Sequence, residues 1–293
     1  MNAKEQYKDW ILHYQYILKN RSTLKNKKKM VQALVHDILQ ITKNIQVIEF
    51  QSNGKESSQN VYVGDLKHAN VMICTYFDTP LSYWGPYYFF QIESQKKQTM
   101  IKNIFYALIT LAIGVGLTLF YMKSISQGFS FFSWKTLVVS MLFGIYFVFL
   151  AKVSKGQLNR KNLIRNTSSI LCLLQMIRDN KRKDVVFAFL DKGCQGDLGL
   201  EAMKDSLPKD CKIYYLDSIG AHAPLHVLGR DFSQEILDKY SIDWYTKEND
   251  VNVWISADKN SKGLMLTKKQ LNQKVIEEKN IETFMKVMRE MLC

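Results

Sequence analysis

DVVFAFLDKGCQGDLGLEAM, residues 184–203, begins with an apolar run that is closed by an aspartate at each end. Such a continuous run is typical of a strand that is buried on both faces of a sheet. The stretch that follows, DLGLEAMKDSL at 197–207, has helical spacing and ends before Pro208, which cannot continue a helix. A buried strand followed directly by a helix is the building unit of an α/β fold.

The same alternation extends outward in both directions. VMICTYF at 71–77 and KIYYLD at 212–217 are two more buried strands by the same criterion. Further strands are predicted at 45–52 and 60–65, and apolar positions at helical spacing predict helices around 10–17, 30–41, 168–179, 233–240 and 281–292. We therefore expect a three-layer α/β/α fold with a mixed sheet.

Two long apolar segments interrupt this order. Asn103–Met122 is 20 residues without a formal charge, and Thr136–Ala151 is 16 more, which Phe131, Phe132 and Trp134 extend upstream. About 20 helical residues cross the roughly 30 Å hydrocarbon layer. We therefore predict a transmembrane hairpin at 101–152 with spans 103–122 and 132–151. It would be inserted into one discontinuous domain, 1–100 with 153–293. The alternative is a pair of buried core helices in a soluble protein.

Basic residues flank the predicted hairpin on both outer sides. These membrane-proximal residues are Lys96, Lys97, Lys102, Lys152, Lys155, Arg160 and Lys161. The loop between the spans holds only Lys123, with Lys135 at its edge. The positive-inside rule then places both flanks in the cytoplasm of a cell-membrane protein with two spans.

The formal net charge of +13 admits either an anionic membrane or nucleic acid as a partner. The basic run Lys19, Arg21, Lys25, Lys27, Lys28 and Lys29 is expected to face the anionic inner leaflet. No nucleic-acid-binding motif accompanies the charge, so we expect the lipid bilayer and no nucleic acid as a partner. The five cysteines lie far apart without a C-x-x-C pair, which is typical of reduced thiols.

Four stretches between residues 60 and 220, in this order, carry a family resemblance. They are NVYVGDLKHANVMICTYFDTP, RNTSSILCLLQM, KDVVFAFLDKGCQGDLGLEAM and KIYYLDSIG. They resemble the metal-site motifs of the zinc-dependent aminopeptidases, a family that includes the glutaminyl cyclases. The resemblance implies a sheet whose strand ends hold two zinc ions, and a glutamate that acts as general base.

Most of the family's functional residues are replaced in this chain. The resemblance puts the first histidine ligand at Tyr76, and the aspartate two positions on is kept as Asp78. The metal-bridging aspartate falls at Arg165, and the Glu-Glu pair falls at Gly193 and Cys194. A ligand aspartate is kept as Asp217, whereas residues 263–272, where the last histidine is expected, contain none.

These six positions form a vestigial active-site cleft: Tyr76, Asp78, Arg165, Gly193, Cys194 and Asp217. A guanidinium between two cation sites repels metal, and loss of a well-placed base typically costs 10²–10⁴-fold in rate. We therefore expect no catalytic residue, no metal and no cofactor. We also expect Asp78 and Asp217 to form hydrogen bonds or to pair with Arg165, which would neutralise the former metal cleft.

Three other features of the sequence each allow a functional and an ordinary structural interpretation. His222 and His226 form either a two-His metal face or, as Pro224 between them favours, loop histidines. Cys194 is either a nucleophile or a small residue that fills the old pocket. LSYWGPYYFFQ, residues 81–91, is either an aromatic wall for a peptide or an aromatic belt at the membrane interface.

The sequence thus predicts a catalytically inactive, membrane-anchored, peptidase-like protein. It would act as a binding or scaffold subunit of a bacterial membrane complex, for example with a transporter or a machinery for peptide export, processing or immunity. A bound peptide is a further possible partner. The alternatives are a divergent membrane-bound zinc aminopeptidase, a hydrolase that uses Cys194, and an integral subunit whose soluble domain supports assembly.

Overall fold

The computed structural model describes residues 3–51, 57–125, 130, 132–154, 156–194, 196–246 and 250–292. The chain divides into two compact units. The first, here called the sheet unit, comprises Met1–Pro80, Pro86–Ile92 and Asn159–Cys293. The second, the hairpin unit, comprises Leu81–Gly85 and Glu93–Leu158.

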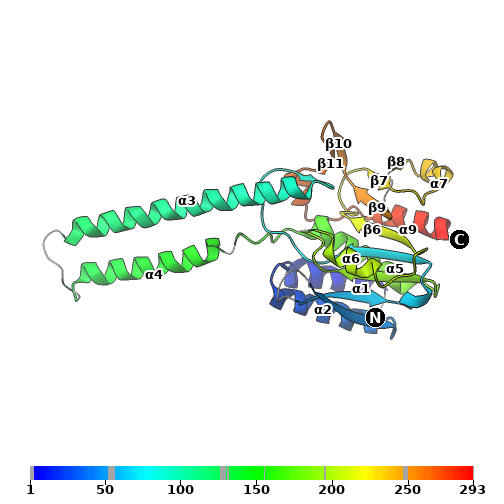
Figure 1. Ribbon diagram of the computed structural model, residues 1–293, viewed down its shortest axis with the longest axis horizontal. Helices are drawn as coiled ribbons and strands as arrows, with labels where there is room; N and C mark the ends of the chain where they lie inside the picture. Colours follow the sequence, from blue (N-terminus) through cyan, green and yellow to red (C-terminus); the bar gives the residue numbers. More distant parts are fainter. Residues whose placement is uncertain are drawn as a thin grey trace. The chain divides into compact units, whose positions relative to one another are not determined.

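An eight-stranded mixed sheet forms the centre of the sheet unit, in the order β1-β2-β5-β3-β6-β9-β7-β8 (Figure 1). Its strands are β1 (Ile45–Gln51), β2 (Ser57–Val63), β3 (Val71–Tyr76), β5 (Val185–Leu190), β6 (Lys212–Asp217), β7 (Leu225–Leu228), β8 (Asp243–Tyr245) and β9 (Val251–Ser256). The four central strands β5, β3, β6 and β9 run parallel, so their carboxyl ends lie at one edge. We call this the carboxyl edge.

Helices cover both faces of this sheet, as the continuous apolar strands require. Every residue of β3, β5 and β9 is buried, which is possible only where both faces are covered. The helices are α1 (Ala3–Leu12), α2 (Leu24–Leu39), α5 (Ser168–Asp179), α6 (Leu198–Lys204), α7 (Gln234–Lys239), α8 (Lys268–Leu271) and α9 (Glu278–Leu292). Short turns are η1 (His13–Ile17), η2 (Leu66–His68) and η3 (Leu163–Thr167). The predicted three-layer α/β class is confirmed.

A second, three-stranded sheet has the order β10-β11-β4, formed by Asp258–Asn260, Gly263–Leu266 and Tyr87–Tyr88. In it, Tyr87 pairs with Leu266 and Tyr88 with Met265. The sequence did not predict this small sheet. It matters for the site because it holds the segment that carries Tyr87.

The hairpin unit is built on two long apolar helices, α3 (Ile92–Ile125) and α4 (Trp134–Ser154) (Figure 1). Both are long and apolar enough to cross a membrane, and only 6% and 11% of their most apolar windows are buried. They are therefore not the buried core helices of the alternative prediction. The two helices pack closely where Gly114 leaves room for the hydroxyl of Tyr146. Helix α3 begins well before the predicted start of the first span.

The basic residues around the hairpin differ in exposure. Lys96, Lys97 and Lys152 are exposed on the helices, and Arg160 and Lys161 are exposed in the sheet unit. Lys102 is buried, and its ammonium donates to the hydroxyl of Ser82 at 2.6 Å. Lys155 and Phe131 lie outside the described residues.

The basic run near the amino terminus corrects a prediction. Lys19, Lys25, Lys28 and Lys29 are exposed, but Arg21 is 0% exposed and Lys27 is 8% exposed. These two side chains point into the sheet unit, so they cannot face an anionic leaflet. The reason is helical phase: Lys27 lies on the same face of α2 as the buried residues Met30 and Leu34.

Candidate functional site

All six predicted positions gather at the carboxyl edge of the sheet. Tyr76 and Asp217 are the last residues of β3 and β6, and Asp78 follows β3. Gly193 and Cys194 lie in the turn after β5, and Arg165 lies in η3, just before α5. Parallel strands place residues from distant parts of the sequence together at such an edge. We call this group the carboxyl-edge cluster.

Asp217 is surrounded by hydroxyl donors. The hydroxyl of Tyr87 donates to Oδ2 at 2.6 Å, and the hydroxyls of Tyr76 and Ser218 donate to Oδ1 at 3.2 Å and 2.8 Å. The carboxylate is 5% exposed, and this burial raises its pKa above the ordinary aspartate value. Both carboxylate oxygens are therefore occupied by protein hydrogen bonds.

Arg165 reaches Asp217 through tyrosines. Its Nε donates to the hydroxyl of Tyr76 at 3.1 Å, and its guanidinium carbon lies 4.1 Å from the ring centre of Tyr87. The charge of Arg165 acts to lower the pKa of Asp217 against the larger effect of burial. Arg165 and Asp217 are thus connected through the side chains of Tyr76 and Tyr87.

Asp78 forms hydrogen bonds, which is one of the two arrangements expected for it. Its Oδ1 accepts the backbone N–H of Gly193 at 2.9 Å and that of Cys194 at 3.2 Å. It thereby holds the turn after β5 in place. Burial raises the pKa of Asp78 to about 6, against the lowering influence of Lys27.

Gly193 lies close against the end of β3 at Tyr76. A Cβ atom built on Gly193 would overlap the Cβ of Tyr76 and lie 3.1 Å from the hydroxyl of Tyr215. Since every residue other than glycine at position 76 has a Cβ, any larger side chain at position 193 needs the backbone of β3 or of the turn after β5 to shift. Glycine at position 193 therefore allows these two segments to approach closely.

Two buried cations beside the cluster were missed as site residues. Lys27 forms a 2.5 Å ion pair with Asp191, the residue directly after β5. The Nη2 of Arg21 donates to Asn166 and Thr167, both at 2.8 Å, and burial lowers the pKa of Arg21 to about 10. Two features of the sequence could have predicted the Lys27–Asp191 pair: Lys27 shares a helix face with apolar residues, and Asp191 directly follows a buried strand. No feature of the local sequence predicts that Arg21 is buried.

The residues present do not fit a pair of zinc ions. Zinc sites in proteins use histidine, cysteine and carboxylate ligands that are free to coordinate. Within the described part of the chain, no group of three or more such residues could hold a metal. The carboxylates of Asp78 and Asp217 are already hydrogen-bonded, and Arg165, which the resemblance aligns with the bridging aspartate, donates to Tyr76.

Cys194 lacks the surroundings of a nucleophile. Its thiol donates to the backbone carbonyl of Asp78 at 3.0 Å, and burial raises its pKa well above the ordinary thiol value. A thiolate nucleophile needs the opposite shift, from a nearby base or cation. Cys74, Cys172 and Cys211 are also free and buried, and Cys293 lies outside the described residues.

The two histidines do not form a shared site. Nδ1 of His222 lies 2.7 Å from Glu277, whereas Nδ1 of His226 lies 3.3 Å from Asp243. His226 lies in β7 and is 3% exposed, so its prediction as a loop histidine was wrong. The strand is the mostly apolar stretch LHVL, residues 225–228, and Pro224 lies just before it, where it does not interrupt the strand.

The aromatic stretch 81–91 is divided between the units. Trp84 packs on Phe105 within the hairpin unit, at 5.2 Å between ring centres. Tyr87 belongs to the sheet unit and enters the carboxyl-edge cluster, where no sequence motif had placed it.

Comparison with known proteins gives structural matches only. No protein-family model matches the chain, and no curated protein matches it by sequence. A glutaminyl cyclase from Tannerella forsythia has a similar structure, with a TM-score of 0.55, 10% identity, and 99% of this chain and 97% of that chain covered. A Zn-dependent exopeptidase from Parabacteroides distasonis has a TM-score of 0.54, 11% identity, and the same coverage of 99% and 97%.

A leucine aminopeptidase precursor from Bacteroides thetaiotaomicron has a TM-score of 0.54 and 9% identity, with 99% of this chain and 96% of that chain covered. At such low identity these likenesses establish the fold and not the activity. The chain therefore has the mixed α/β fold of the zinc aminopeptidases and glutaminyl cyclases.

Proposed function

We propose that this protein is a catalytically inactive, membrane-anchored member of this fold that binds a partner. It would serve as a scaffold subunit of a bacterial membrane complex for peptide export, processing or immunity. The observation that carries the proposal is the hydrogen bonding of Asp217. A carboxylate that accepts from Tyr76, Tyr87 and Ser218 is committed to structure rather than to a metal.

The surrounding charges support the same reading. Arg165, Lys27 and Arg21 are all buried beside Asp78, Asp191 and Asp217. Cations from the protein thus stand where metal cations would otherwise balance buried carboxylates. A buried ion pair is retained only with good geometry, and the Lys27–Asp191 pair meets that condition.

Membrane anchoring is supported by α3 and α4, which are long enough, apolar enough and exposed enough to span a bilayer. The excess of lysine and arginine outside the loop between them supports a cytoplasmic sheet unit. We therefore keep the domain limits predicted from the sequence as part of the proposal. The soluble domain is 1–100 with 153–293, and the transmembrane hairpin is 101–152.

The test is the metal content and turnover of the full chain, purified in mild detergent without chelators. We expect less than stoichiometric zinc, no hydrolysis of aminoacyl-p-nitroanilides and no cyclisation of an N-terminal glutaminyl peptide. The Asp217→Asn variant is the matched control, and its zinc content is expected to equal that of the parent. About two zinc ions per chain, lost in Asp217→Asn together with turnover, would overturn the proposal.

The scaffold role has its own test. Affinity purification of the tagged chain from native membranes in mild detergent is expected to recover a membrane-protein partner in fixed ratio. Recovery of the chain alone, at full yield, would contradict this role.

A further inference from the structure

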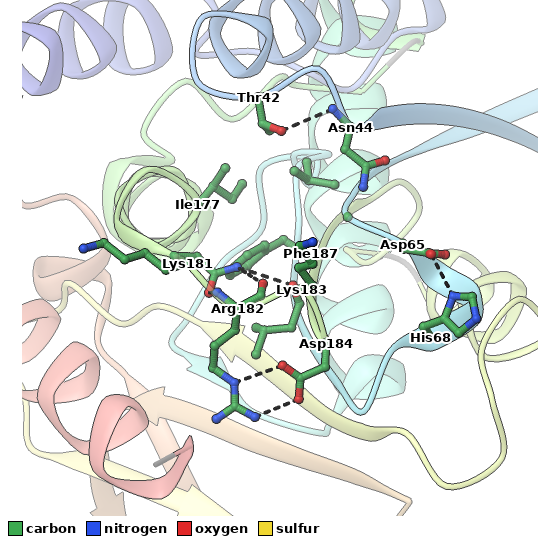
Figure 2. A pocket seen from close by; sticks show the side chains of 14 residues that line it. Thr42, Asn44, Asp65, His68, Ile177, Lys181, Arg182, Lys183, Asp184 and Phe187 are labelled. Atoms are coloured by element: carbon green, nitrogen blue, oxygen red, sulfur yellow. Dashed lines mark hydrogen bonds and ion pairs between the residues drawn. The ribbon is translucent and has the colours of Figure 1, made fainter.

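Two hollows lie side by side in the sheet unit, at the edge of the sheet opposite the carboxyl-edge cluster. The first has a volume of about 600 Å³ and is lined in part by the end of β2 and the start of β5 (Figure 2). The second, of about 420 Å³, is lined by residues of α5, β5 and α9. They share Asn180, Lys181, Arg182, Val185 and Phe187, so the loop from α5 to β5 separates them.

Each hollow has an apolar wall. Val63, Ile177, Val185 and Phe187 line the first, and Ile177 and Phe187 are seen on its wall in Figure 2. Met176, Met285 and Leu292 line the second together with the shared apolar residues. Methionine is a flexible, polarizable side chain that adapts to different apolar partners. The two walls suit two apolar groups that are held some distance apart.

The ridge between the hollows is basic. Arg182 makes a bidentate ion pair with Asp184, at 3.0 Å and 2.7 Å, which holds the pKa of Asp184 down at about 2 (Figure 2). Asp65, the other acid at the rim of the first hollow, pairs with His68 at 2.8 Å. Arg182 thus balances Asp184, and the two exposed lysines Lys181 and Lys183 outnumber the remaining acid, Asp65, so the ridge has excess positive charge.

The ridge has a defined backbone. The side chain of Asn180 donates to the carbonyl of Arg182 at 2.9 Å and accepts the N–H of Arg182 at 3.1 Å. An asparagine side chain that hydrogen-bonds to the backbone two residues further along fixes the loop as a turn. Lys181 and Lys183 therefore leave the chain from a positioned backbone, on either side of Arg182.

We propose that this surface binds an acidic peptide segment in which apolar side chains flank the acids. The apolar side chains would enter the two hollows, and the acids between them would lie over Lys181 and Lys183. A small anionic molecule would fill one hollow only, whereas an extended segment matches the order apolar, basic, apolar. The proposal rests on the proposed function, because it gives the chemistry of the partner that a scaffold would recognise.

The test is fluorescence anisotropy with the full chain in mild detergent and fluorescein-labelled tetrapeptides and pentapeptides. The acidic probes are Leu-Asp-Glu-Leu and Leu-Asp-Glu-Asp-Leu, and the comparison probes are Leu-Lys-Lys-Leu and Ser-Asp-Glu-Ser. We expect the acidic apolar probes to bind at least about tenfold more tightly than either comparison probe, with affinity falling as salt rises.

Variants test each part of the surface. Lys181→Gln with Lys183→Gln is expected to weaken binding about fivefold to tenfold, as loss of two exposed ion pairs predicts. Met285→Asp is expected to weaken it through the second hollow. The matched control, Lys268→Gln with Lys269→Gln, removes two exposed lysines of α8, which packs near η3 at the opposite edge, and is expected to bind like the parent.

Three results would overturn the site: no binding of either acidic apolar probe, equal binding of Ser-Asp-Glu-Ser, or no effect of the Lys181 and Lys183 substitutions. The metal and turnover measurements concern the opposite edge of the sheet. The failure of this proposal and the failure of the proposed function are therefore distinguishable.

Discussion

The hydroxyl of Tyr87 donates a 2.6 Å hydrogen bond to Oδ2 of Asp217, a residue 130 positions further along the chain. Tyr87 is held there by pairing of β4 with β11, and Asp217 by its place at the end of β6. The contact therefore joins the small sheet to the carboxyl edge of the large one. It places a protein donor on the carboxylate that the family resemblance would give to zinc.

Replacing Tyr87 with phenylalanine tests this contact. Tyr87→Phe leaves Asp217 buried with one donor fewer, so we expect the free energy of unfolding to fall by about 1–3 kcal/mol. Urea unfolding of the full chain in mild detergent measures the change. Tyr88→Phe is the matched control, since the Tyr88 hydroxyl only accepts an exposed 3.3 Å hydrogen bond from Asn260. Equal effects of the two substitutions would count against the contact.

Removal of the buried guanidinium has a larger expected effect. Arg165→Ala takes away the partner of Tyr76 and the cation that faces Tyr87, and we expect a loss of about 3–5 kcal/mol. Arg165→Lys keeps the charge without the planar group, so its free energy of unfolding should lie between those of the parent and of Arg165→Ala. Thermal unfolding of both is compared with Arg230→Ala, whose exposed pair with Asp250 contributes little. An unchanged melting temperature in Arg165→Ala contradicts a buried network.

The Lys27–Asp191 pair is open to a double-mutant cycle. Lys27→Met alone leaves a buried aspartate without its partner, and we expect a cost of about 3–5 kcal/mol. Adding Asp191→Leu removes the stranded charge, so the double variant should be more stable than Lys27→Met. The coupling is read from chemical unfolding of the four proteins. Simple additivity of the two changes would show that the pair is not coupled.

The raised pKa of Asp78 predicts a pH dependence with a definite sign. With a pKa of about 6 when folded and an ordinary value of 3.8, the native state binds its proton more tightly than the unfolded chain does. The contribution to stability is therefore full below about pH 4 and is lost as pH rises through about 6. Asp78→Asn keeps an oxygen acceptor for Gly193 and Cys194 and should flatten this dependence. A parent and variant with parallel pH profiles between pH 4 and 7 would exclude the shift.

Close packing at Gly193 gives a steric prediction. Gly193→Ala forces the alanine Cβ against Tyr76 and should cost about 1–3 kcal/mol in unfolding free energy. Gly196→Ala is the matched control, because nothing lies within 4 Å of a Cβ there. If Gly193→Ala and Gly196→Ala lower the free energy of unfolding equally, the close approach of position 193 to Tyr76 is not the cause.

The buried strands were predictable because their residues are apolar without interruption. β3 and β5 show this pattern, and their predicted ranges agree with the structure to within one residue at each end. β9 was missed because Asn252 and Ser256 interrupt its apolar pattern. Both polar side chains are satisfied from other segments: Asn252 accepts the N–H groups of Arg230 and Asp231, and Ser256 donates to the carbonyl of Ile219. Partners so far along the chain leave no mark in the local sequence.

The sequence predicted which residues at the strand ends belong to the candidate site. It did not predict the hydrogen bonds that these residues form. Asp78 and Asp217 follow apolar strands, and parallel pairing brings such positions to one edge. For Asp78 the sequence left open hydrogen bonds or a pair with Arg165, and only the structure shows that it accepts the N–H groups of Gly193 and Cys194. Tyr87 and Arg21 come from segments whose position depends on the packing of the whole sheet unit.

The α/β class and the two apolar helices follow from the sequence alone, since each depends on the chemistry and periodicity of a short segment. The replacement of the family's ligands stays a prediction from the resemblance. Only the tertiary structure decided which donors occupy Asp217, that Lys27 and Arg21 are buried, and where the two hollows lie beside Lys181 and Lys183. Those contacts join residues up to 146 positions apart, as from Arg21 to Thr167, and the energy of a buried hydrogen bond depends on partners that only the folded chain assembles.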